Sequence, residues 1–203
     1  MSERRYRMTK RLESTERTRA SIIDAARELL AEGGPEEFSV QRIADRAGVT
    51  RPTIYARFGS RREFLETLVA DAEQRAGVAA AIAASEAPDP VDAMVDWLQA
   101  AVAFWASEHA VLGSAYALSR TDPDLSGVLA AHDEARHRRA KRLARRLASA
   151  GRLRKGYSTV QAADTLWLIS GFAVYQELSR NGHTPAAITR TVVQLARTAI
   201  VAP

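Results

Sequence analysis

The feature that most constrains this sequence is the spacing of its apolar residues, which recur at intervals of three and four. That spacing places apolar side chains on one face of an α-helix, and no stretch of useful length shows the period of two that strands require. Three helix starts place a capping side chain directly before a proline, at Asp89, Asp122 and Thr184. Proline has no N–H to lose in a first turn, so it favours a start there. The chain is predicted to be all-α.

Capping boxes and glycines set further helix boundaries. Ser60 with Glu63, and Ser158 with Gln161, have the spacing at which each side chain satisfies the other residue's free backbone N–H. Glycines at 33, 34, 48, 151 and 182 mark helix ends. From these patterns we expect nine helices, at residues 15–32, 39–47, 51–58, 61–85, 90–107, 110–120, 123–150, 159–180 and 185–199.

Several classes of site and location are disfavoured by composition. The chain has no cysteine, which excludes disulfides, thiolate metal sites and cysteine nucleophiles and suits a reducing cytoplasm. The four histidines, His109, His132, His137 and His183, lack metal-ligand spacing, so we expect no metal and no cofactor. Residues 1–18 lack the apolar core of a signal peptide, and no run of about 18 apolar residues occurs. We therefore expect a cytoplasmic protein without a membrane partner.

Residues 38–58, FSVQRIADRAGVTRPTIYARF, form a pattern of two short helices joined by a tight turn. Ile43 and Ala44 give the first helix a small apolar face, and Gly48 follows where the chain must turn sharply. Thr50 can cap the second helix, whose buried side is supplied by Ile54 and Phe58. This is the helix-turn-helix pattern, in which the second helix lies in the major groove of DNA.

The polar residues of this segment suit a DNA contact, and a net charge of +5 favours a polyanionic partner. Arg51 stands at the exposed start of the second helix, where arginine can bond the O6 and N7 of guanine. Phosphate contacts are expected from Arg57, Arg61 and the Tyr55 hydroxyl. Ser39 and Gln41 open the first helix, where free N–H groups attract phosphate. The expected DNA-binding residues are Ser39, Gln41, Thr50, Arg51, Pro52, Thr53, Tyr55, Arg57 and Arg61.

The same residues also allow an interpretation without a role in DNA binding. The arginines at 51, 57, 61 and 62 could form a solvated basic face, and a Gly turn between two helices occurs by chance in many helical proteins. Tyr55 and Phe58 are residue types found more often in a core than at a contact.

Over residues 17–68 the sequence resembles the tetracycline-repressor (TetR) family of transcriptional regulators. The similarity lies in RTRASIIDAARELLAEGGPEEFSV and in IADRAGVTRPTIYARFGSRREFLETLV, including the tyrosine, the phenylalanine three residues on, and the basic residue Arg61 before the fourth helix. The resemblance implies a homodimer, an N-terminal DNA-binding domain, and C-terminal helices that bind a small molecule and release the DNA. The segment GRLRKGYSTVQAADTLWLISGFAVYQEL is also similar to the eighth helix of many members and the loop before it.

The expected division has three parts, with the seam within the fourth helix because short helices precede it and long ones follow. Residues 1–14 form a basic flexible tail, 15–62 the helix-turn-helix DNA-binding domain, and 63–203 the helical ligand-binding and dimerisation domain. The tail carries five basic residues against Glu3 within its first 11 positions. Many family members start closer to the first helix. The tail could follow a groove, as basic arms do, or be disordered.

The last two helices are predicted to make the dimer. The helix at 159–180 is apolar on two sides, so one side can face its own core and the other a partner. The family's interface of two helices from each subunit would result, and a monomeric core is the alternative. The expected interface residues are Trp167, Gly171, Val174, Leu178, Ile188, Val192 and Leu195.

A ligand pocket is predicted from large apolar side chains of the C-terminal half, although the same residues also suit an ordinary core. The helix at 123–150 adds His132 and Arg136, two polar residues that interrupt its apolar stripe one turn apart. They could meet a polar or anionic part of a ligand, or form a salt bridge instead. The expected pocket residues are Trp97, Ala101, Phe104, Trp105, Tyr116, His132, Arg136, Phe172 and Tyr175.

The function predicted from the sequence is that of a DNA-binding transcriptional regulator, a repressor released from its operator by a small-molecule effector. Its expected partners are double-stranded operator DNA, a second copy of the chain and that effector. No nucleophile–base pair or phosphate loop is apparent, so we do not expect an enzyme. The alternatives are a non-specific architectural DNA-binding protein and a helical carrier or enzyme without a role on DNA.

Overall fold

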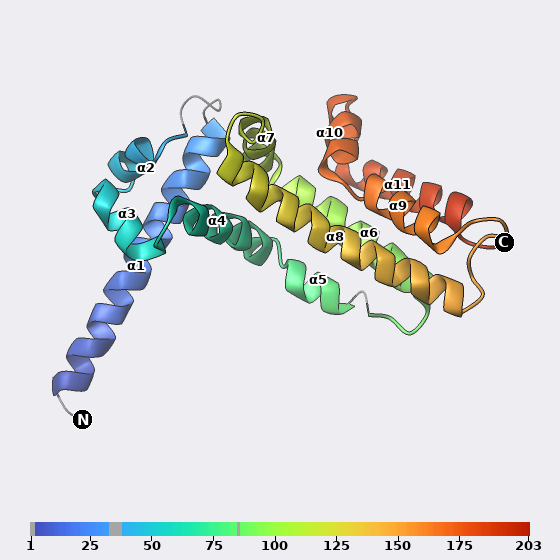
Figure 1. The fold of residues 1–203 in the computed structure, drawn as a ribbon, viewed down its shortest axis with the longest axis horizontal. Coiled ribbons are helices and arrows are strands. Elements are labelled where there is room, and N and C mark those ends of the chain that lie inside the picture. Colours follow the sequence, from blue (N-terminus) through green and yellow to red (C-terminus); the bar gives the residue numbers. More distant parts are fainter. Residues whose placement is uncertain (1–2, 33–37, 85) are drawn as a thin grey trace. The chain divides into compact units, whose positions relative to one another are not determined.

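The computed structural model describes residues 3–32, 38–84 and 86–203, and it is helical throughout apart from loops and one isolated bridge (Figure 1). The all-α prediction is confirmed, since no named strand occurs in these ranges. Within them the helices are α1 (Glu3–Glu32), α2 (Val40–Arg46), α3 (Arg51–Phe58), α4 (Arg61–Arg75), α5 (Val78–Ala84), α6 (Pro90–Ser107), α7 (His109–Leu118), α8 (Pro123–Ser149), α9 (Thr159–Ile169), α10 (Phe172–Arg180) and α11 (Pro185–Ile200).

The helices fall into two compact units. The first comprises Met1–Asp71 and Ala110–Val128, and the second Ala72–His109 and Leu129–Pro203. Helix α8 therefore begins in the first unit and continues in the second. None of the helices in the described part of the chain is long and apolar enough to cross a membrane.

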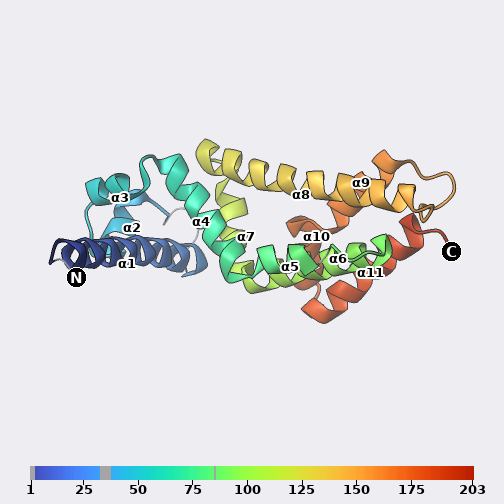
Figure 2. The same ribbon diagram turned by 90° about the horizontal axis from the view of Figure 1, so that it is seen from below.

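In the first unit, α1, α2 and α3 pack against one another (Figures 1 and 2). Ile22 of α1, Ile43 of α2 and Ile54 of α3 are buried where these three helices pack against one another. Phe58 at the end of α3 contacts Phe64 of α4 edge to face, with the ring centroids 5.1 Å apart. This core fixes the angle at which α3 is presented.

In the second unit, α6 is the central helix and packs against α5, α10 and α11, while α11 also contacts α9 and α10 (Figure 2). Met94, Leu98 and Trp105 of α6 are completely or almost completely buried. The chain end is tied to the loop after α8, because Arg154 N–H donates to Ile200 O at 2.8 Å and Ala202 N–H to Arg152 O at 2.8 Å.

Three of the expected helices have different limits in the structure. The first begins at Glu3 and not at residue 15, so the expected tail overlaps α1. The helix expected at 61–85 ends at Arg75, where Gly77 takes a positive φ of 64° that suits glycine, and α5 follows. The helix expected at 159–180 is interrupted at Ser170 and Gly171, which separate α9 from α10.

Candidate functional site

The helix-turn-helix is built by local hydrogen bonds that the sequence encodes directly. Ser39 Oγ accepts from Arg42 N at the start of α2, and Thr50 Oγ1 accepts from Thr53 N at the start of α3. Between them Gly48 adopts a φ of 66°, and Val49 N–H donates to Ala44 O at 2.9 Å. These contacts satisfy the free backbone groups at both helix ends and set a tight turn between α2 and α3.

The outer side of α3 presents most of the residues expected to contact DNA. Arg51, Pro52 and Arg57 are exposed, Thr53 is half-buried, and Tyr55 is 36% exposed. The opposite side buries Ile54 and Phe58 in the core. The buried side of α3 thus fixes the helix in the core, and its exposed N-terminal side chains can enter a groove of DNA.

Three of the expected residues already form hydrogen bonds within the motif. Gln41 Nε2 donates to Asp45 Oδ1 at 2.7 Å, and the hydroxyls of Thr50 and Thr53 lie 2.9 Å apart. Both contacts are exposed, so water or a phosphate can compete with them.

Arg61 is placed differently from the expectation that it lies free for a phosphate. It opens α4, and its guanidinium bonds Asp122 and also Asp124, the latter at 3.2 Å. The side chain of Asp122 is only 12% exposed, and the Arg61 guanidinium holds the pKa of this carboxyl below its usual range. In this structure Arg61 forms ion pairs with two carboxylates of the first unit.

Two further arginines that sequence reasoning did not single out hold the motif in place. Arg19 lies over the Phe58 ring, 4.6 Å from its centroid, and donates to Arg57 O and to Thr67 Oγ1. Arg46 at the end of α2 pairs with Glu28 and Glu32 of α1 at 3.2 and 3.1 Å. No spacing rule joins α1 to partners this far along the chain, so nothing local pointed to them.

Several residues expected to line a ligand pocket form an aromatic cluster in the second unit. Trp105 contacts Phe104, His132 and Phe172, with centroid distances of 4.6, 6.0 and 5.4 Å. Tyr175 stacks on Phe172 at 6.4 Å. Trp97 is buried on the same helix α6 and Ala101 is half-buried, whereas Tyr116 belongs to the first unit.

The two polar residues of α8 have protein partners, which is the salt-bridge alternative considered for them. His132 Nδ1 lies 2.9 Å from Glu73 Oε1, and this contact lowers the pKa of the Glu73 carboxyl. Arg136 pairs with Asp133 at 3.1 Å and bonds Trp167 O and Ser170 Oγ. Arg136 thus places positive charge at the C-terminal end of α9, where the helix dipole favours it.

The residues expected at a dimer interface divide into two groups. Ile188 and Val192 are 1% exposed and face the core of their own chain, and Gly171 is buried as the N-cap of α10. Trp167, Val174 and Leu178 are half-buried. Leu195 is 49% exposed, and Leu168, which was not expected there, is 60% exposed. The uncovered apolar surface is therefore carried by the predicted Leu195 on α11 and by the unpredicted Leu168 on α9.

The helix-turn-helix and its flanking helices are similar to a known family of proteins. Residues 22–68 match the family model described as bacterial regulatory proteins, tetR family. Those residues run from the buried part of α1 through α2 and α3 into α4. None of the curated proteins matches the chain.

Solved structures share the fold across most of the chain. NalD, the secondary repressor of the MexAB-OprM multidrug efflux pump in Pseudomonas aeruginosa, is 20% identical with a TM-score of 0.72, covering 93% of this chain and 98% of that one. A putative TetR-family regulator from Rhodococcus sp. is 15% identical with a TM-score of 0.72, covering 90% and 98%. FadR from Bacillus subtilis, in complex with stearoyl-CoA, is 18% identical with a TM-score of 0.65, covering 87% and 96%.

A helix-turn-helix carried by an all-α chain of this fold defines a DNA-binding transcriptional regulator. The chain is thus similar to TetR-family regulators in its DNA-binding motif, through the match at residues 22–68, and in its fold.

Proposed function

We propose that this protein is a homodimeric repressor that binds operator DNA through α3 and is released by a small molecule. The observation that carries the DNA contact is the two-sided character of α3. Ile54 and Phe58 fix the helix in the core, while Arg51, Tyr55 and Arg57 stand on its accessible surface. Arg51 at the first turn would contact a base edge, and Arg57 one turn and a half later would contact a phosphate.

The dimer is supported by the apolar side chains that one chain leaves uncovered. Val160 and Leu168 of α9 and Leu195 of α11 are exposed, although their residue types favour burial. A second copy related by a two-fold axis would cover the same surface on both subunits. The two α3 helices of such a dimer could then enter successive major grooves, which lie about 34–36 Å apart.

Release by a small molecule is supported by the large apolar and aromatic side chains of the second unit and by the relatives. NalD is a repressor, and the structure of FadR holds stearoyl-CoA. A ligand of this chain would release DNA only through a difference in affinity between the DNA-bound and free conformations.

The test is binding to the DNA upstream of the protein's own gene, with Arg51→Ala and Arg57→Ala compared at fixed salt. The two variants remove the same charge from the same helix, so they form a matched pair. We expect nanomolar binding by the unaltered protein, about a thousandfold tighter than to random DNA. Arg51→Ala should lose about 1–3 kcal/mol and its sequence preference, whereas Arg57→Ala should weaken all sequences alike and reduce the salt dependence.

Equal loss of specificity in both variants would show that α3 does not read bases through Arg51. If selection from random sequences also yields no preferred site, the operator-binding proposal is wrong and a non-specific DNA-binding protein remains.

A further inference from the structure

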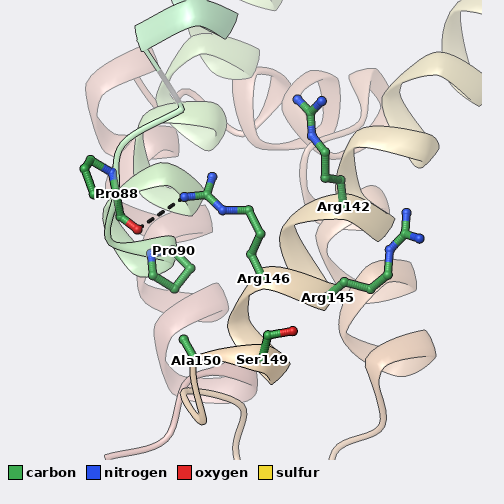
Figure 3. A pocket seen from close by; sticks show the side chains of 7 residues that line it. All are labelled: Pro88, Pro90, Arg142, Arg145, Arg146, Ser149 and Ala150. Atoms are coloured by element: carbon green, nitrogen blue, oxygen red, sulfur yellow. Dashed lines mark hydrogen bonds between the residues drawn. The ribbon is translucent and has the colours of Figure 1, made fainter.

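A surface pocket in the second unit lies away from the aromatic cluster and takes part in none of the roles proposed so far. Its volume is about 450 Å³, within the range of small-molecule sites. One wall is the end of α8, and the other is the segment that leads into α6 (Figure 3). The lining residues are Pro88, Pro90, Arg142, Arg145, Arg146, Ser149 and Ala150.

The three arginines of the pocket come from the end of α8, and their guanidiniums point in different directions (Figure 3). Arg146 reaches the carbonyl oxygens of Ala87 and Pro88, which holds its guanidinium across the pocket (Figure 3). Arg142 pairs with Glu86 at 2.5 Å, and Arg146 also lies 3.9 Å from the same carboxylate. Arg145 donates to Lys141 O, and it forms no ion pair in the described part of the chain. Arg142 and Arg146 thus share the Glu86 carboxylate, and Arg145 adds a positive charge that no carboxylate pairs with in the described part of the chain.

A fourth arginine, Arg139, is also affected by the positive charge of these side chains. Arg139 lies one turn before Arg142 on α8, and its Nε is buried without a hydrogen-bond partner among the described residues. Its pKa is lowered, first by burial and then by the charge of Arg142, and Glu86 only partly opposes this. An added anion would relieve the repulsion between these groups.

We propose that this pocket binds the phosphate group of a small molecule. Arginine pairs with phosphate through two parallel N–H···O bonds, and several guanidiniums at one open surface pocket suit a group with more than one negative charge. Pro88, Pro90 and Ala150 give the pocket apolar walls against which the rest of such a molecule can lie. A DNA backbone is favoured less, because its phosphates would leave the apolar walls at Pro88, Pro90 and Ala150 without a partner.

The inference goes beyond the proposed function and does not depend on it. The residues belong to α8 and to the segment before α6, whereas operator binding was assigned to α3. The pocket can therefore be tested without DNA, and failure of one proposal leaves the other intact.

The experiment is calorimetric titration of the full chain with inorganic pyrophosphate at low ionic strength, where screening is weakest. Arg145→Ala is the test variant. Arg138→Ala is the matched control, because Arg138 is an exposed arginine of the same helix that pairs with Glu134 and does not line the pocket. We expect Arg145→Ala to weaken pyrophosphate binding about tenfold or more, and Arg138→Ala by less than about twofold.

A second variant makes a prediction of opposite sign. Glu86→Gln keeps the shape of the side chain but removes the carboxylate that competes for Arg142 and Arg146. Pyrophosphate should then bind about fivefold more tightly, the factor expected for one charge a few ångströms away in water. If pyrophosphate were held loosely anywhere on a basic surface, it would lie farther from Glu86 on average. Its affinity would then increase far less in Glu86→Gln.

Three outcomes would overturn the proposal. Equal weakening by Arg145→Ala and Arg138→Ala would mean non-specific attraction to the helix. Malonate binding as tightly as pyrophosphate would exclude selectivity for phosphate. Loss of affinity for a random duplex in Arg145→Ala, with pyrophosphate binding unchanged, would assign the surface to nucleic acid.

Discussion

Replacing Arg61 by methionine should destabilise the first unit measurably, although Arg61 lies at its surface. The change removes the partner of Asp122, whose side chain is 12% exposed, and one partner of the better-solvated Asp124. Asp122 would keep the N–H of Leu125 at 3.1 Å. Hydrogen bonds between charged groups contribute about 1.5–3 kcal/mol when shielded from water. Because Arg61 is itself 31% exposed, screening reduces this, and we expect a loss of about 1–2 kcal/mol.

Arg62→Met is the matched control, since Arg62 is the next residue and also forms an ion pair. Its partner Glu66 lies one turn along the same helix, and both side chains are 51% exposed. Such a pair contributes about 0.3–0.5 kcal/mol. Thermal denaturation followed by circular dichroism should therefore show a lower midpoint for Arg61→Met, by a few degrees, and almost no change for Arg62→Met.

The effect of Arg61→Met should depend on pH in a direction that the Asp122 pKa fixes. Because Arg61 lowers the pKa of Asp122, the stabilisation is complete above the unfolded value of about 3.9 and is lost as pH falls through the folded value. The difference between the unaltered protein and Arg61→Met should be full at pH 7 and shrink below about pH 4. Equal destabilisation by Arg61→Met and Arg62→Met, or a difference that persists in strong acid, would refute the reasoning.

Two further changes test the second unit. Leu168→Glu and Leu195→Glu should each shift the proposed dimer toward the 22.2 kDa monomer in light scattering, because a carboxylate would be buried between the subunits. An unchanged dimer in the double variant would place the interface elsewhere. Trp105→Phe should cost about 1–3 kcal/mol in thermal denaturation, since Ser170 O would lose the indole N–H at 2.8 Å. Trp97→Phe is the control, because the buried Trp97 indole has no hydrogen bond among the described residues. An equal loss of stability in both variants would contradict the role assigned to the Trp105–Ser170 hydrogen bond.

The helix-turn-helix could be predicted from the sequence because its determinants are local. Gly48 supplies the positive φ of the turn, and Thr50 caps α3 three residues before its bonding partner. The alternation of buried and exposed positions on α3 also follows from the spacing of Ile54 and Phe58. Every one of these relations lies within a few residues, which is the range over which sequence patterns specify structure.

The break between α9 and α10 was not predicted, and several contacts at it come from far away in the chain. The indole of Trp105 bonds Ser170 O from α6, and the guanidinium of Arg136 bonds Trp167 O and Ser170 Oγ from α8. These donors satisfy carbonyl and hydroxyl groups at the end of α9, so the chain need not continue as a helix there. In the sequence, the Ser170–Gly171 dipeptide is the local signal at this point, and the expectation of one continuous helix did not take it into account.

Of the interface residues expected on α11, Ile188 and Val192 are buried within their own chain for a different reason. An apolar stripe shows that a helix has a buried side, but it does not show whether its own chain or a partner covers that side. Here Ile188, Val192, Ala196 and Ile200 follow one another at intervals of four and pack inward. Leu195 falls three residues after Val192, at the edge of the stripe, and remains exposed. Only packing within the chain distinguishes the two groups.

The same distinction applies to the positive charge of this protein, nearly all of which is arginine. Arg46, Arg61 and Arg136 are occupied by carboxylates or backbone oxygens, where a planar group with five donors can join separate helices. The carboxylates that pair with them offset much of their charge at short range. Arg51 and Arg57 remain on the accessible side of α3. Net charge alone therefore overstates the surface available to a polyanion, and the affinity for an operator should depend on a few arginines placed by the fold.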